Sequence, residues 1–123
     1  MPKKKILIIE DNRALVTTLR DMLNSQGMEV ELALDAKIGF EKAKKIKPNL
    51  IVLDIMLPGE SGFTCLAELK KHAGTKKIPV LILSNLGQTH EVREGIKMGA
   101  EAYLVKAEYS IQEIGNRIKE LVK

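Results

Sequence analysis

The sequence predicts an α/β domain in which five parallel strands form one doubly wound sheet, with the strand order 2-1-3-4-5. Short apolar runs alternate with stretches whose apolar residues recur at helical spacing, five times within 123 residues. The run at residues 50–53 is apolar throughout, as expected of a strand buried on both faces. Neither a linker nor an internal repeat interrupts the alternation, so residues 1–123 are expected to form a single domain.

The boundaries of the ten elements follow from breakers and caps. The predicted strands occupy residues 4–9, 28–34, 50–53, 79–83 and 102–105. Residues 28–34 alternate apolar and acidic side chains, which is typical of a half-exposed edge strand. The predicted helices begin at Asp11 or Asn12, at Asp35, after Ser61, before Val92 and at Ser110. Gly27 and Gly99 end the first and fourth helices, and Pro48 limits the second.

Composition narrows the class of protein. Charged residues make up 29% of the chain and its net charge is +4, but there is no Trp and aromatics are only 3%. Without interleaved aromatic and basic residues, direct nucleic-acid binding is not expected. The lysine groups at 3–5, 42–47 and 70–77 are interpreted as solvated helix ends, with attraction to an acidic partner as the alternative.

Membrane insertion and secretion are not expected either. No apolar run approaches the roughly 20 residues that span a bilayer. Cys65 is the single cysteine and cannot form an internal disulfide; it is interpreted as a packing residue on a helix. The expected location is therefore the cytoplasm, with no membrane partner.

Polar side chains end four of the five predicted strands: Glu10 and Asp11, Asp54, Ser84, and Lys106. In the order 2-1-3-4-5 the first and third strands are neighbours, so the three carboxylates should converge at the carboxyl edge of the sheet. Two carboxylates about 5 Å apart repel by roughly 3 kcal/mol at an effective dielectric constant of about 20. A cation is therefore expected, and an all-oxygen ligand set favours Mg²⁺.

Together these groups are suited to phosphoryl transfer. A carboxylate such as Asp54 can act as the nucleophile, while a metal, a lysine and a hydroxyl neutralise the oxygens of the phosphoryl group. For Asp54 alone, an aspartate that only helps the following turn is an equally good interpretation. His72 and His90 lie on predicted helices and are interpreted as surface residues, so Ser-His-Asp catalysis has no support.

Four segments carry a resemblance to a known family. They are IEDN at 9–12, LDIMLPGESG at 53–62, LS at 83–84 and GAEAYLVK at 99–106. In this order and spacing they resemble the response-regulator receiver domain, the phosphoacceptor module of two-component signalling, over essentially the whole chain. The resemblance implies a flavodoxin-like (βα)5 fold and a signalling domain that catalyses only its own phosphorylation and dephosphorylation.

The resemblance also implies roles for the residues at the site. Asp54 would accept a phosphoryl group from a histidine kinase or a phosphotransfer protein. Asp11, Asp54 and the backbone carbonyl of Met56 would bind Mg²⁺, and Glu10 would act mostly through water. Lys106 would contact the phosphoryl group.

Two further residues are implied to act as a switch. Ser84 would follow the phosphoryl group, and Tyr103 would then pack inward; the alternative for Tyr103 is an ordinary tyrosine of an amphipathic strand. The face formed by the fourth helix, fifth strand and fifth helix would change its affinity for a downstream protein target or an attached output domain. A weak homodimer through this face and the choice between a free-standing regulator and one domain of a longer protein stay open.

Three departures from the family pattern qualify these expectations. Ala107 stands where family members usually have a proline after the lysine, often with a cis bond, so the bond is either trans or strained. Asn85 stands where a small residue is usual. Met56 and Leu86 are apolar at the positions that flank the attacking water, which predicts self-dephosphorylation over minutes or longer.

Two other functions remain as alternatives. A pseudo-receiver would keep the fold as a phosphorylation-independent protein-interaction module, and Ala107 and Asn85 favour it. A hydrolase with an aspartate nucleophile would need a second carboxylate two residues after Asp54, where this chain has Met56.

Overall fold

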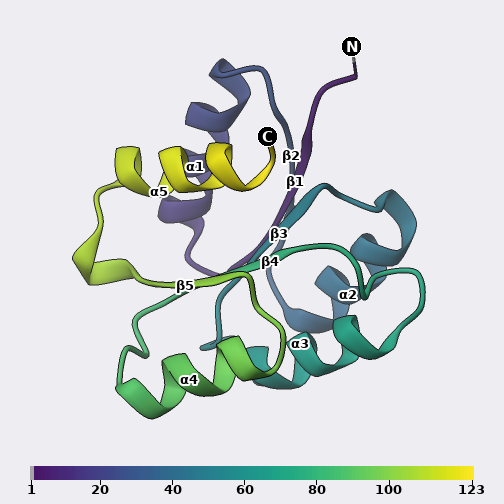
Figure 1. The fold of residues 1–123 in the computed structure, drawn as a ribbon. Helices are drawn as coiled ribbons and strands as arrows, with labels where there is room; N and C mark the ends of the chain where they lie inside the picture. Colours follow the sequence, from purple (N-terminus) through teal and green to yellow (C-terminus); the bar gives the residue numbers. More distant parts are fainter. Residues whose placement is uncertain (1) are drawn as a thin grey trace.

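A five-stranded parallel sheet forms the centre of the computed structural model, which describes residues 2–123 (Figure 1). The strand order is β2-β1-β3-β4-β5, as the sequence predicts. The strands are β1 (Lys5–Ile9), β2 (Glu29–Ala33), β3 (Leu50–Leu53), β4 (Val80–Ser84) and β5 (Ala102–Val105). The three inner strands are almost wholly apolar and buried, whereas β2 exposes alternate residues at the edge.

Helices cover both faces of the sheet. They are α1 (Arg13–Ser25), α2 (Ala36–Ile46), α3 (Gly62–Lys71), α4 (Thr89–Lys97) and α5 (Ile111–Leu121). α1 and α5 bury their apolar stripes in one hydrophobic cluster, and α2 and α3 bury theirs in a second cluster on the opposite face. Such two-sided cover explains why the inner strands are almost wholly apolar.

Local capping explains where the helices begin. The Asn12 side chain accepts a hydrogen bond from the Leu15 amide at 3.1 Å, which decides between the two N-cap candidates of α1. At α5, Ser110 and Glu113 form the predicted capping box. α1 ends at Ser25, and the chain reverses at Gly27, whose φ of +88° favours glycine.

Two features of the edges were not apparent in the sequence. α4 buries only Gly95, and its Ile96 side chain is 45% exposed, so this helix packs on the sheet with little apolar area. At the opposite edge, the Lys42 ammonium donates a hydrogen bond of 2.5 Å to the carbonyl oxygen of Leu32 in β2. No helix within residues 2–123 has the length and apolar character needed to cross a membrane.

Candidate functional site

The carboxylates of Glu10, Asp11 and Asp54 meet at the carboxyl edge of the sheet. β1 and β3 are hydrogen-bonded neighbours in which Ile9 lies opposite Leu53, and the Asp54 amide donates to the Ile9 carbonyl at 3.0 Å. One carboxylate oxygen from each of the three side chains lies within 4.8 Å of the others. The predicted convergence is therefore confirmed.

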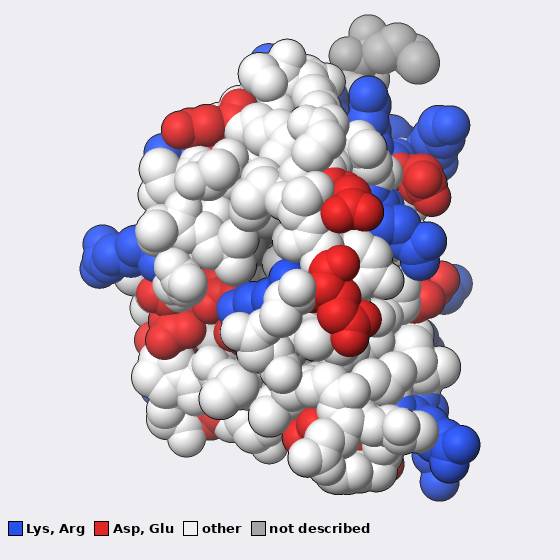
Figure 2. All heavy atoms as spheres, turned by 90° about the vertical axis from the view of Figure 1, so that its left-hand side faces the viewer, with Lys and Arg blue, Asp and Glu red and all other residues white. Residues whose placement is uncertain are grey.

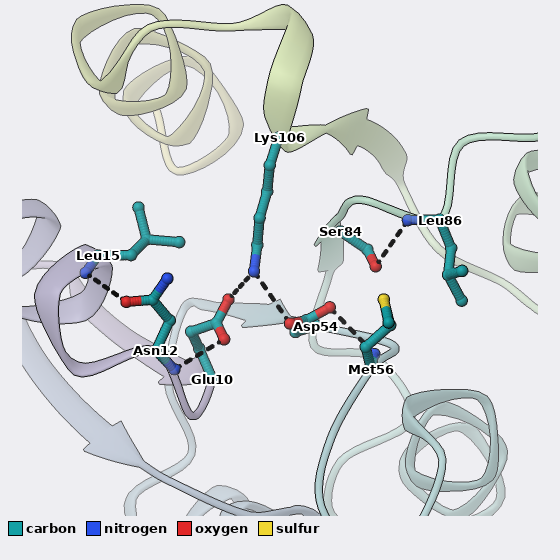
Figure 3. A network of polar contacts seen from close by, with 8 residues as sticks. All are labelled: Glu10, Asn12, Leu15, Asp54, Met56, Ser84, Leu86 and Lys106. Carbon is teal, nitrogen blue, oxygen red and sulfur yellow. Dashed lines mark hydrogen bonds and ion pairs between the residues drawn. The ribbon is translucent and has the colours of Figure 1, made fainter.

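Lys106 connects the two buried carboxylates. Its ammonium donates a hydrogen bond of 3.0 Å to Asp54 Oδ2 and also forms an ion pair with Glu10 Oε1 (Figure 3). The lysine side chain is 16% exposed, and those of Glu10 and Asp54 are 4% and 5% exposed. Burial alone would lower the pKa of Lys106, but the bonds and negative charges of the two carboxylates outweigh burial and raise it.

Glu10 and Asp11 differ in their surroundings although they are adjacent. Glu10 is buried, and its Oε2 accepts a hydrogen bond of 3.0 Å from the Asn12 amide. Burial raises the pKa of Glu10, the Lys106 ion pair and the Asn12 hydrogen bond oppose this rise, and the Asp54 charge adds to it. Asp11, in contrast, is exposed to solvent. Figure 2, which views the edge where the strands end, shows acidic side chains on both sides of a basic one.

The loop after β3 holds the Asp54 carboxylate in place. The Met56 amide donates to Asp54 Oδ1 at 3.1 Å, while the Met56 side chain is 56% exposed at the mouth of the site. The loop turns back at Gly59, where φ is +80°. A Cβ on Gly62 would lie 2.3 Å from the Asp54 carbonyl oxygen, so the start of α3 can approach this loop only with glycine there.

Ser84 and Tyr103 both bond to the backbone of Leu86. The Ser84 hydroxyl oxygen is fully buried and accepts a hydrogen bond of 3.3 Å from the Leu86 amide, so it is directed toward Leu86 in Figure 3. The Tyr103 hydroxyl donates to the Leu86 carbonyl oxygen. Tyr103 is half-buried and packs against the second hydrophobic cluster. Leu86 could not be identified as the common partner from the sequence, because a backbone amide and carbonyl carry no residue-type signal.

The segment after Lys106 differs from the family pattern. The Lys106–Ala107 peptide bond is trans, like every peptide bond in residues 2–123, and residues 106–108 form a short 3₁₀ turn that leads toward α5. Asn85 is exposed and makes no side-chain hydrogen bond within the described part of the chain. Both histidines are exposed: His90 lies on α4, and His72 follows the end of α3 rather than lying on it.

A family model for the response regulator receiver domain matches residues 6–119. This chain belongs to the response-regulator receiver family. Its relatives include the DNA-binding dual master transcriptional regulator RpaA of Synechocystis, 36% identical over 97% of this chain and 49% of the relative. The phosphate regulon transcriptional regulatory protein PhoB of Rhizobium meliloti is 33% identical over 97% of this chain and 52% of the relative. This receiver chain thus spans about half the length of these curated relatives.

Solved receiver structures have the same fold. A CheY-like response regulator receiver domain protein of Methanospirillum hungatei superposes with a TM-score of 0.89 at 26% identity, covering 98% of this chain and 94% of the other. The receiver domain of the Francisella response regulator 1452 gives a TM-score of 0.88 at 29% identity, covering 98% and 97%. The predicted flavodoxin-like receiver fold is confirmed.

The acidic cluster of this receiver suits a small divalent cation. All of its side-chain donors are carboxylate oxygens, the ligands that Mg²⁺ prefers in proteins. Exposed Asp11 leaves the cluster open to solvent, so an ion could enter and keep several waters. Glu10 Oε1 is buried and forms an ion pair with the Lys106 ammonium, but it accepts no hydrogen bond within the described residues. The cluster therefore retains acceptor capacity that a cation can use.

Proposed function

We propose that this receiver is a phosphoacceptor switch that takes a phosphoryl group on Asp54 from a histidine kinase or a phosphotransfer protein. The observation that carries the proposal is the contact of the Lys106 ammonium with Asp54 Oδ2 and Glu10 Oε1, beside the exposed Asp11. A lysine in this position stabilises the negative charge of a carboxylate nucleophile and of the phosphoryl group that it receives.

The proposed reaction is a direct transfer. An oxygen of the Asp54 carboxylate attacks phosphorus, the bond from phosphorus to the donor breaks, and its electron pair leaves with the donor. Glu10, Asp11, Asp54 and the Met56 backbone carbonyl would hold Mg²⁺, which when bound neutralises charge on the phosphoryl oxygens. Lys106 would move from its contacts with the two carboxylates onto the phosphoryl group. The reason is that the phosphoryl oxygens remain negatively charged, and the lysine ammonium can balance that charge.

The proposed output is a change of surface. In the structure the Ser84 hydroxyl accepts a hydrogen bond from the Leu86 amide. In the phosphorylated protein the same hydroxyl would donate a hydrogen bond to a phosphoryl oxygen. Moving this hydroxyl shifts the loop after β4, and Tyr103, bonded to Leu86 in the same loop, transmits the shift to the face of α4, β5 and α5. A downstream protein or an attached output domain would bind that face in one of its two states.

Other parts of the proposal concern the setting of the receiver. Residues 1–123 would act as one receiver domain. The relatives RpaA and PhoB, which are transcriptional regulators about twice as long, support an output at the level of transcription. A cytoplasmic location fits the single free thiol at Cys65. Signalling, rather than turnover of a substrate, is the proposed role.

Intact-mass measurement after incubation with Mg²⁺ and acetyl phosphate tests the proposal. We expect one added phosphoryl group on the native protein and none on Asp54→Asn. Asp21→Asn, a substitution at an exposed aspartate of α1, is the matched control and should be phosphorylated normally. No addition to the native protein at any donor concentration would contradict the proposal and favour a phosphorylation-independent interaction module.

A further inference from the structure

β2 is an edge strand of the sheet, with α1 on one face and α2 on the other (Figure 1). Residues of these three elements line a groove at this edge. It has a volume of about 500 Å³, and its floor is aliphatic: Val16, Leu32, Ala33, Leu34 and Ile38. A second hollow of about 520 Å³ continues it along α2 and shares Ile38 and Lys42 with it. We call the two together the β2-edge groove.

The β2-edge groove is strongly basic. Its cations are Arg13, Arg20, Lys37, Lys42, Lys44 and Lys45. Against these six cations it has one acidic residue, Glu41, which gives a net charge of +5. Since the whole chain carries +4, the remaining residues carry a net charge of −1. The residues that line the groove thus carry more positive charge than the rest of the chain, although Lys44 and Lys45 also lie in the last turn of α2.

Most of these cations are not neutralised within the chain. Arg20 contacts Asp21 at 3.3 Å, and Lys44 contacts Glu41 at 2.9 Å. The other four cations have no carboxylate within ion-pair distance in residues 2–123. Ile38, which both hollows share, is 47% exposed in the middle of them. An exposed isoleucine surrounded by unpaired cations favours a ligand that is both acidic and apolar.

One backbone acceptor on the free edge of β2 is already used within the chain. The Leu32 carbonyl, at the free edge of the sheet, already accepts a hydrogen bond from the Lys42 ammonium. A ligand would therefore bind through side chains rather than by extending the sheet. No aromatic side chain lines either hollow, so bases have nothing to stack on, and a phosphate backbone would leave the aliphatic floor unused.

We infer that the β2-edge groove binds an acidic amphipathic helix of a partner protein. The apolar stripe of such a helix packs on Ile38 and the aliphatic floor, and its flanking carboxylates pair with the cations of α1 and α2. The inference is independent of the proposed phosphoacceptor function, because it involves neither Asp54 nor the face of α4, β5 and α5. The groove reaches Arg13, which directly follows the Asn12 cap beside the carboxylate cluster.

The test uses a labelled synthetic helix of about 18 residues, or five turns, with leucines along one stripe and glutamates beside it. Fluorescence anisotropy measures its binding to the unphosphorylated protein. We expect micromolar binding that weakens as salt is added. We expect about a tenfold loss, corresponding to ~1.4 kcal/mol, in Ile38→Ser and in Lys37→Glu combined with Lys45→Glu.

Matched control variants separate the groove from the rest of the surface. Ile96→Ser removes a comparably exposed isoleucine, at 45%, from α4. Arg117→Glu combined with Lys119→Glu reverses two exposed cations of α5. Both controls should bind the acidic helix like the native protein, and a helix with lysine in place of glutamate should not bind.

Three outcomes would overturn the inference. The acidic helix fails to bind, or it binds equally well to the groove variants and the native protein. In the third, the native protein binds anionic phospholipid vesicles or duplex DNA, the groove variants lose that binding, and the acidic helix remains unbound; the groove would then serve a different class of partner.

Discussion

The Tyr103 hydroxyl donates a hydrogen bond to the carbonyl oxygen of Leu86, 17 residues earlier in the chain. Burial first, and then the charges of Glu91 and Asp54, raise the pKa of this tyrosine, while the nearby Ser84 side chain opposes the rise. The tyrosine ring lies against Gly95 of α4: a Cβ there would be 2.9 Å from Tyr103 Cδ2 and 2.6 Å from Ile82 Cδ1. The inward position of Tyr103 therefore depends on the absence of a side chain at Gly95.

Gly95→Ala is expected to displace the Tyr103 ring. In a Tyr109→Phe background Tyr103 is the single tyrosine, and absorbance titration should give a pKa above the ordinary value of 10.0. Gly95→Ala should bring this pKa down toward 10.0 as the ring becomes hydrated. Helix propensity alone would favour alanine by about 1 kcal/mol. A loss of thermal stability would therefore come from the overlap of the added Cβ with Tyr103 and Ile82.

Gly115→Ala is the matched control for this substitution. Its Cβ would meet only the flexible end of Met22, at 2.9 Å from the sulfur, so the pKa of Tyr103 should not change. An unchanged tyrosine pKa in Gly95→Ala would show that the ring does not depend on this glycine.

Lys106→Met is expected to destabilise the metal-free protein. It leaves the carboxylates of Glu10 and Asp54, both almost fully buried, without the cation that contacts them. Breaking a buried ion pair in this way costs about 3 kcal/mol, and added Mg²⁺ should recover part of the loss. Urea unfolding followed by circular dichroism measures both effects, with Lys97→Met on the surface of α4 as the control. Equal stabilities for the two variants would contradict this account of Lys106.

Met56→Asn is expected to speed dephosphorylation of Asp54. The Met56 side chain is exposed at the mouth of the site, where an amide could bind the attacking water. A rate increase of about tenfold would correspond to ~1.4 kcal/mol in the barrier. Decay of the phosphorylated mass measures the rate, and Met56→Leu should leave it unchanged. No acceleration in Met56→Asn would contradict the expected slow hydrolysis.

Leu86→Glu is expected to change the stability of the protein as well as the rate of dephosphorylation. Its side chain is half-buried and packs against the second hydrophobic cluster, so a glutamate would lose apolar contact before it could reach the site. We expect faster dephosphorylation together with a lower unfolding midpoint in urea. Acceleration without any loss of stability would show that the Leu86 side chain is free to turn outward.

Much of the site could be predicted from residue order alone. Parallel strands end at the same edge of a sheet, so fixing the strand order also fixed which polar side chains meet there, including Glu10, Asp54 and Lys106. Periodicity likewise distinguished the buried β3 from the half-exposed β2.

The remaining features depend on loop conformation and on packing between elements. The link from Tyr103 to Leu86 joins a side chain to a backbone carbonyl, and no pattern of residue types marks that carbonyl. Ile96 has the spacing of a core residue but is exposed. Apolar periodicity in a sequence does not reveal whether another element covers the apolar face of a helix. The β2-edge groove needs α1 and α2 to flank one strand, which the lysine spacing alone does not reveal.

Cys65 is expected to be inert in the folded protein. It is 1% exposed, and burial, followed by the charges of Glu60 and Glu68, raises the pKa of its thiol from the ordinary value of 9.0 to about 12. Between pH 9.0 and pH 12 the Cys65 thiol of the folded protein keeps a proton that the unfolded chain loses. The contribution of Cys65 to the free energy of unfolding is therefore complete below pH 9.0 and declines toward pH 12. Stability curves of the native protein and Cys65→Ala should therefore converge over that interval; a constant difference would contradict the raised pKa.

The buried thiol also has a practical consequence for spectroscopy. A thiolate is the form that maleimides and methanethiosulfonates attack, and Cys65 supplies almost none of it while the chain is folded. A cysteine introduced at an exposed position would then take a fluorophore or spin label alone, with the natural residue left in place. Distances between domains or partners could thus be followed without a cysteine-free background.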